Sequence, residues 1–186
     1  MAFHLFRTSQ VAKDLAAGGV PPRAQAGYLV ISFLAWTLPF YLYLIPSPVA
    51  ADPVFLGWMW LIEFVLVVAI FVTGVNYCLR KCRVDARANF LIDFSCLYAP
   101  VALTTSIVIW GAFHLLTTLP AWMVARAGSG HEALRALPWL SSAYAYDVLR
   151  LLFYLAAILV IFWRVGEHME RLSGLRQSAP ARRVNR

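Results

Sequence analysis

Two residues of opposite charge stand inside long apolar stretches of this chain. Glu63 is the single charged residue between Asp52 and Arg80, and Arg150 lies in the first half of a later apolar stretch. Each follows the start of its stretch by about eight residues, which is about 12 Å at helical rise. Because a charge inside lipid costs a few kcal/mol and usually pairs or marks a pathway, we expect Glu63 and Arg150 to meet side by side.

Two further polar residues extend this pair into a predicted cluster of Glu63, His114, Asp147 and Arg150. Asp147 precedes Arg150 by three residues and so shares its helix face. His114 approaches the same side of the membrane from a third stretch. In one interpretation the acids neutralise Arg150 and fix helix register. In the other, the cluster binds a proton or a ligand. If the fourth stretch begins later than expected, Asp147 and Arg150 are only interfacial.

A second polar site is predicted on the cytoplasmic side. Asp93 lies one turn inside the start of the third stretch, where the backbone dipole favours negative charge. We expect Asp93 to pair with Arg80 or Arg87, and Asn76 and Tyr77, at the facing end of the second stretch, to complete a small polar pocket with Asp93. The favoured interpretation of Asp93 is structural.

Prolines and cysteines add local expectations. Pro39 and Pro100 lack an amide hydrogen near mid-stretch and should bend their helices. Cys78 and Cys82 are four residues apart, on one helix face at the membrane boundary. Two thiols without further ligands are a weak signal for a metal or an acyl chain, so we expect reduced cysteines and no metal. Cys96 is the third cysteine.

The sequence predicts no catalytic residues and no cofactor. It contains no phosphate-binding glycine loop, no GxSxG, no HExxH and no dinucleotide-binding glycine pattern. His114 is the single histidine within the apolar stretches, so one chain cannot supply two histidine ligands to a haem there. Enzymatic activity therefore has no support in the sequence.

The composition predicts the elements that position these residues. Hydrophobic residues make up 61% and charged residues 13% of the 186 residues, far from the roughly half and one quarter typical of soluble domains. Four stretches, about 27–46, 55–79, 90–119 and 142–164, reach the ~20 residues that a spanning helix needs. Since lipid cannot satisfy unpaired backbone groups, we expect an all-α membrane protein of four helices.

Basic residues predict the orientation of these helices. Three stand in the N-terminal tail, four in the second connection and six at the C-terminal end, against none in the first connection and two in the third. Cytoplasmic loops carry such an excess, so both termini should be cytoplasmic and the bundle up-down-up-down. The frequent use of Arg and Ala favours a bacterial inner membrane.

The predicted organisation has three parts. Residues 1–26 form a cytoplasmic tail with a short interfacial amphipathic helix, in which Val11 and Leu15 face lipid. Residues 27–164 form the transmembrane domain, and 165–186 a basic cytoplasmic tail, expected without regular structure from Gln177.

Steps of three and four residues predict which helix faces share the interior of the bundle, because small and polar side chains mark packed faces in lipid. These faces are Tyr28, Ser32, Ala35 and Pro39; Trp60, Glu63, Val67, Ile70 and Gly74; Asp93, Leu97, Pro100, Thr104, Ile107, Gly111, His114 and Thr118; and Tyr144, Asp147, Leu151 and Tyr154.

The expected function is that of a non-enzymatic subunit, anchor or interaction partner of a larger membrane assembly. The alternative is a small proton-coupled carrier, or a lipid- or ligand-binding protein, that uses the predicted cluster. The expected partners are other membrane subunits or a second copy, not nucleic acid. Anionic lipid headgroups are expected at the second connection, through Arg80, Lys81, Arg83 and Arg87.

Overall fold

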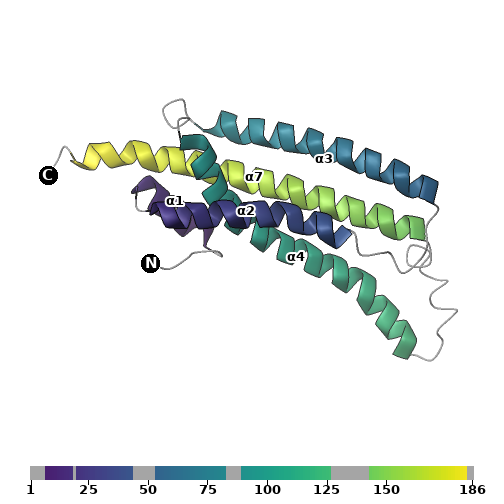
Figure 1. Ribbon diagram of the computed structural model, residues 1–186. Helices are drawn as coiled ribbons and strands as arrows, with labels where there is room; N and C mark the ends of the chain where they lie inside the picture. The colour runs from purple at the N-terminus through teal and green to yellow at the C-terminus, as the bar shows by residue number, and fades with distance from the viewer. Residues whose placement is uncertain (1–6, 19, 44–52, 83–88, 127–142, 184–186) are drawn as a thin grey trace.

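The computed structural model describes residues 7–18, 20–43, 53–82, 89–126 and 143–183. Within these ranges the chain forms helices throughout, as predicted (Figure 1). The helices are α1 (Thr8–Ala16), α2 (Pro22–Tyr43), α3 (Pro53–Lys81), α4 (Phe90–Arg126) and α7 (Ala143–Arg183).

Three of these helices are long and apolar enough to cross a membrane. The qualifying segments are Gly57–Lys81 in α3, Phe90–Thr117 in α4 and Ala145–Arg176 in α7. They coincide with the second, third and fourth predicted spans. The first predicted span, 27–46, overlaps α2 but ends outside the described residues. The structure therefore supports a membrane protein.

The four long helices pack side by side in a row. Helices α2 and α4 run in one direction and α3 and α7 in the other (Figure 1). The main contacts join α2 to α4, α4 to α7 and α7 to α3, while α1 packs against both α4 and α7. Helices α2 and α3 thus form the edges of a row, whereas we expected four faces around one shared interior.

Most of the buried apolar side chains gather where α1, the start of α4 and the second half of α7 meet. Val11 and Leu15, which we expected to face lipid, are only 1% and 5% exposed because they pack into this cluster. We call this region the Asp93 end, and the region where α7 begins and α4 ends the Asp147 end. The cluster also includes Cys78, Cys82, Cys96, Leu97, Val101, Phe162, Val165, Met169 and Leu172.

Helix α7 continues far beyond the predicted fourth span. We expected that span to end at residue 164 and regular structure to be absent from Gln177, but α7 extends over 41 residues to Arg183. Val165, Met169 and Leu172 recur at intervals of three and four residues, and all three are buried. An apolar stripe of this period holds a helix against its neighbours, and this one packs α7 against the rest of the Asp93 end.

Helices α3 and α7 interlock through two glycines. Gly74 of α3 lies against the ring of Phe162, and Gly166 of α7 lies against the ring of Tyr77. A Cβ atom at either glycine would overlap the facing ring. Each helix therefore receives an aromatic side chain of the other, which is the close approach that small residues permit between membrane helices.

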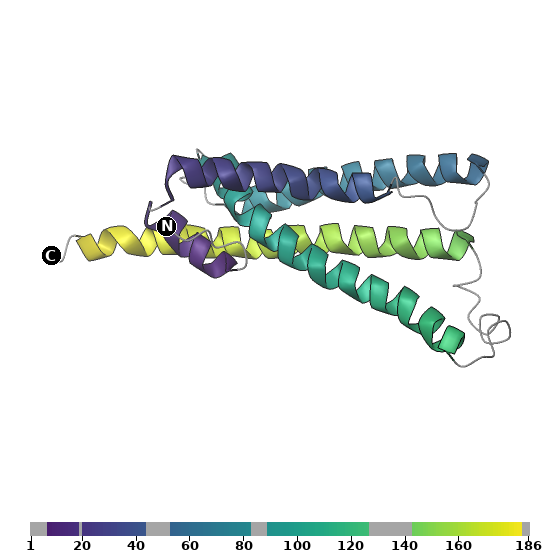
Figure 2. The same ribbon diagram turned by 60° about the horizontal axis from the view of Figure 1, so that its bottom comes forward.

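The predicted inner face of α4 is correct only in its first half. Asp93, Leu97 and Pro100 are buried, but Ile107, Gly111 and His114 are exposed. The inward positions instead follow steps of four residues, with Leu97, Val101, Thr105, Phe113 and Thr117 buried and Ile109 half-buried. Steps of four wind slowly around a helix of 3.6 residues per turn, and α4 accordingly diverges from the other long helices (Figure 2).

The two prolines lie inside helices. The ribbon of α4 changes direction in its first half, which contains Pro100 (Figure 1). The hydroxyl of Thr104 donates a hydrogen bond to the Pro100 carbonyl at 2.8 Å. Pro39 lies within α2, in a part whose side chains fall outside the described residues.

Candidate functional site

The Asp147 end contains a buried carboxylate with an unusual environment. Asp147 is 1% exposed. Its Oδ1 lies 3.2 Å from Nη2 of Arg150, one turn further along α7. Even so, neither oxygen of Asp147 accepts a well-aligned hydrogen bond within the described part of the chain. The charge of Arg150 stabilises that of Asp147 without the directional bonds that buried carboxylates usually receive.

Glu63 lies on the neighbouring helix of the same membrane region. Its side chain is half-buried on α3, and it interacts electrostatically with Tyr154 of α7. Glu63 therefore lies close enough to α7 to interact with it. The structure brings Asp147 and Arg150 together, and the meeting of Glu63 with Arg150 stays a prediction.

His114 is exposed, and the residue before it fills the contact between α4 and α7. Phe113 is 1% exposed. Its ring centroid lies 5.6 Å from that of Tyr146 and 5.4 Å from that of Phe153, both on α7. His114 touches the side of this aromatic group, 5.8 Å from the Phe113 ring. The four-residue period of α4 could have identified Phe113 from the sequence.

Asp93 forms a two-pronged ion pair with Arg176 of α7. Nη1 and Nη2 of Arg176 donate to its two oxygens at 2.6 and 2.9 Å, and Asp93 is 2% exposed. Such a two-pronged pair is geometrically specific and strong. Of the two partners expected for Asp93, Arg80 is exposed at the end of α3, and Arg87 lies outside the described residues. Arg176 reaches Asp93 because α7 continues past its predicted end.

The remaining polar residues of the Asp93 end lie nearer the surface. Asn76 is exposed on α3, so its predicted pocket with Asp93 finds no support in burial. Lys81, expected to contact lipid phosphates, donates to Glu170 of α7 at 2.7 Å. Arg83 and Arg87, two further residues of that predicted lipid contact, lie outside the described residues.

The three cysteines are buried free thiols. Cys78, Cys82 and Cys96 are 0%, 3% and 0% exposed, and Cys78 Sγ donates to the Phe162 carbonyl at 3.6 Å. An acylated cysteine must be accessible, and these three lie inside the apolar cluster. In the ranges that the structure describes, no three His, Cys, Asp or Glu side chains are grouped to hold a metal ion.

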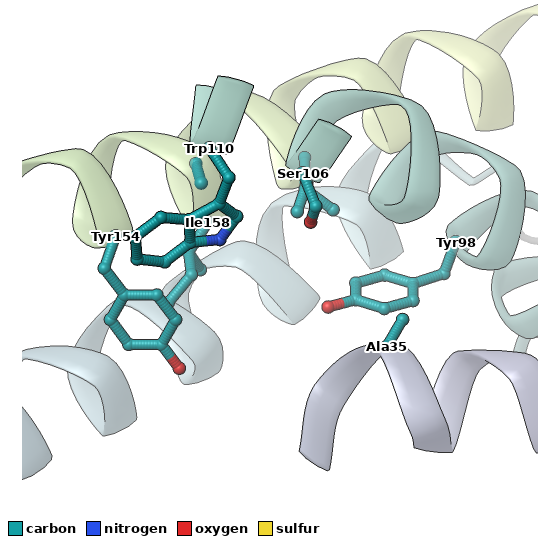
Figure 3. Close-up of a pocket in the computed structure, with 8 residues that line it drawn as sticks. Ala35, Tyr98, Ser106, Trp110, Tyr154 and Ile158 are labelled. Atoms are coloured by element: carbon teal, nitrogen blue, oxygen red, sulfur yellow. The ribbon is translucent and has the colours of Figure 1, made fainter. Parts of the chain in front are cut away.

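A small cleft opens between α2, α4 and α7. Helix α4 contributes Tyr98, Ser106 and Trp110, while Tyr154 comes from α7 and Ala35 from α2 (Figure 3). The cleft has a volume of about 20 Å³, which is about the space that one water molecule needs. The predicted seams included Ala35 and Tyr154 but missed the three residues of α4, because those residues follow the four-residue period.

Comparison with known proteins gives no match: no family model fits the chain, and neither a curated protein nor a solved structure is significantly similar to it.

Proposed function

We propose that this protein is a multi-pass membrane protein that acts, without catalysis, as a subunit, anchor or interaction partner of a larger membrane assembly. In this proposal α2, α3, α4 and α7 all span the bilayer, up-down-up-down. Both chain ends then lie in the cytoplasm of a bacterial cell. Anionic headgroups contact the connection between α3 and α4.

The position of α3 at one edge of the row carries this proposal. In the most apolar segment of α3, only 6% of the residues are buried, against 50% in the corresponding segment of α4 and 33% in that of α7. Its main contacts are with α7 alone. Membrane helices associate by close packing, so a helix with one main neighbour has most of its surface free for lipid or for a second protein.

The exposed face of α3 offers large side chains for such a contact. Phe64 is 66% exposed and Val68, one turn later, is 44% exposed. Trp58 and Trp60, near the start of α3, are 62% and 42% exposed. Aromatic side chains dominate the binding energy of protein contacts. We therefore assign the partner to this face.

Purification of the full chain in a mild detergent tests the proposal. We expect a partner at fixed stoichiometry, either another membrane protein or a second copy, that is lost when Phe64 and Val68 are both changed to alanine. The matched control changes Ile107 and Val108 of α4, which are 56% and 68% exposed, and should retain the partner. A solitary monomer under all mild conditions contradicts the proposal.

The runner-up function is a small proton-coupled carrier. It is favoured by Asp147, because an ionisable side chain buried in a membrane helix without hydrogen bonds often marks a transport pathway. In this reading Glu63 and Asp147 accept protons or cations, Arg150 is the counter-ion and His114 a relay. A Glu63→Gln change that leaves expression intact and removes pH-linked transport would support the carrier over the subunit.

A further inference from the structure

The cleft between α2, α4 and α7 collects polar atoms inside an apolar part of the fold. The hydroxyl of Tyr98, Oγ of Ser106 and the indole nitrogen of Trp110 point toward one space (Figure 3). They stand eight and four residues apart on α4, so one helix presents all three. Ala35 and Ile158 form apolar walls.

These polar atoms make no hydrogen bond with any residue that the structure describes. Tyr98 is only 5% exposed, and its ring is held by stacking on Phe94, with centroids 5.5 Å apart. The ring is therefore fixed while its hydroxyl faces the cleft. Tyr98 is buried and Ser106 and Trp110 are half-buried, and surrounding lipid offers no hydrogen bonds of its own, so these polar atoms can hold a ligand.

The donors define the chemistry of that partner. An indole N–H can only donate a hydrogen bond, and both hydroxyls can donate. Three donors directed at one space suit an acceptor oxygen with two lone pairs. Because the cleft holds about 20 Å³, only the polar tip of a ligand fits inside, and its apolar body must lie outside, along the helices.

We propose that this cleft binds the carbonyl oxygen of a membrane-soluble molecule. The inference goes beyond the proposed assembly function and requires only that α4 and α7 lie in lipid. Two sources carry this chemistry, the ring of a lipid-soluble quinone and the acyl ester of a glycerolipid. A cation fits less well, because the indole N–H of Trp110 has no lone pair to offer it.

Calorimetric titration of the full chain in a maltoside detergent, which has no carbonyl group, tests the proposal. The two probes are a benzoquinone with a decyl chain and dioctanoylglycerol, and binding of one or both identifies the source. Loss of one hydrogen bond weakens binding, so the dissociation constant rises about three- to tenfold. We expect this loss in Tyr98→Phe and in Ser106→Ala for each probe that binds.

Tyr77→Phe is the matched control, because it removes the same hydroxyl from a ring that packs against Gly166. Its affinity should equal that of the unchanged protein. Ala35→Leu fills the cleft from a different helix and should remove binding even if Tyr98→Phe does not fold. The proposal is overturned if neither probe binds the unchanged protein. It is also overturned if Tyr98→Phe and Ala35→Leu bind the probes with the same affinity as Tyr77→Phe. If the purified protein has no assembly partner but still binds a probe, the proposed function is contradicted and the proposed binding site is not.

Discussion

The two ends of this protein treat a buried aspartate in opposite ways. At the Asp93 end, Arg176 donates to both oxygens of Asp93 from the far part of α7, and α1 and α4 pack around the same region. At the Asp147 end, the nearby Arg150 comes from the same helix, and no described residue donates a hydrogen bond to the carboxylate. Helix α4 diverges there (Figure 2).

This contrast indicates that polar contacts between helices stabilise the fold mainly at the Asp93 end. A pair between distant segments stabilises the tertiary fold, because it exists only when α4 and α7 are docked. A pair within one turn of a helix fixes no tertiary contact. The Asp147 end is therefore the part of the molecule where a structural change costs the tertiary fold less.

The largest expected effect is at the Asp93 end. Asp93→Asn leaves the Arg176 charge without its carboxylate, and breaking a buried pair in this way costs about 3 kcal/mol or more. Thermal unfolding of the purified protein in detergent should show this loss of stability. Lys81→Gln, which removes an exposed pair with Glu170, should leave unfolding unchanged. Equal effects of the two substitutions would contradict the proposed importance of the Asp93 end.

A smaller effect is expected where α3 joins the row. Gly74→Ala places a methyl group on the Phe162 ring, and overpacking of this kind costs about 1–3 kcal/mol. Gly111→Ala is the matched control, since a Cβ there meets no atom within 4 Å, and it should be neutral or stabilising by up to about 1 kcal/mol. Unfolding midpoints of the two variants measure the difference. If Gly74→Ala and Gly111→Ala change the unfolding midpoint in the same direction, the close packing at Gly74 is contradicted.

The smallest expected effect is at the Asp147 end. Asp147→Asn also takes the carboxylate from a nearby arginine, Arg150, but it breaks no well-formed hydrogen bond and no pair between helices, so we expect a smaller cost than for Asp93→Asn. The measurement is again thermal unfolding, with Asp93→Asn compared directly. A loss at Asp147 as large as at Asp93 would show that the two ends do not differ as described.

Helix type and approximate helix position could be predicted from the sequence, because apolar length and charge spacing act locally. Glu63, Asp147 and Leu151 lie on the faces that residue spacing predicted, half-buried or buried. The inner face of α4 was predicted only as far as Pro100, since the assumed period of 3.5 residues suits helices that stay parallel, and α4 diverges.

The pairing of Asp93 with Arg176 could not be predicted from charge counts. The sequence shows where each apolar run long enough to span a membrane ends, and the predicted fourth span ends at that position. The signal that was missed is the stripe of Val165, Met169 and Leu172, which keeps a helical period among charged residues. Tertiary packing, not apolar length, decides where α7 ends.

The length of α7 has a mechanical consequence. At 41 residues, the helix measures about 62 Å at 1.5 Å per residue, twice the ~30 Å hydrocarbon thickness. A single stiff helix of this kind couples the two ends of the molecule: a tilt of its second half, which packs against α1 and α4, also moves the buried Asp147 near its first residue.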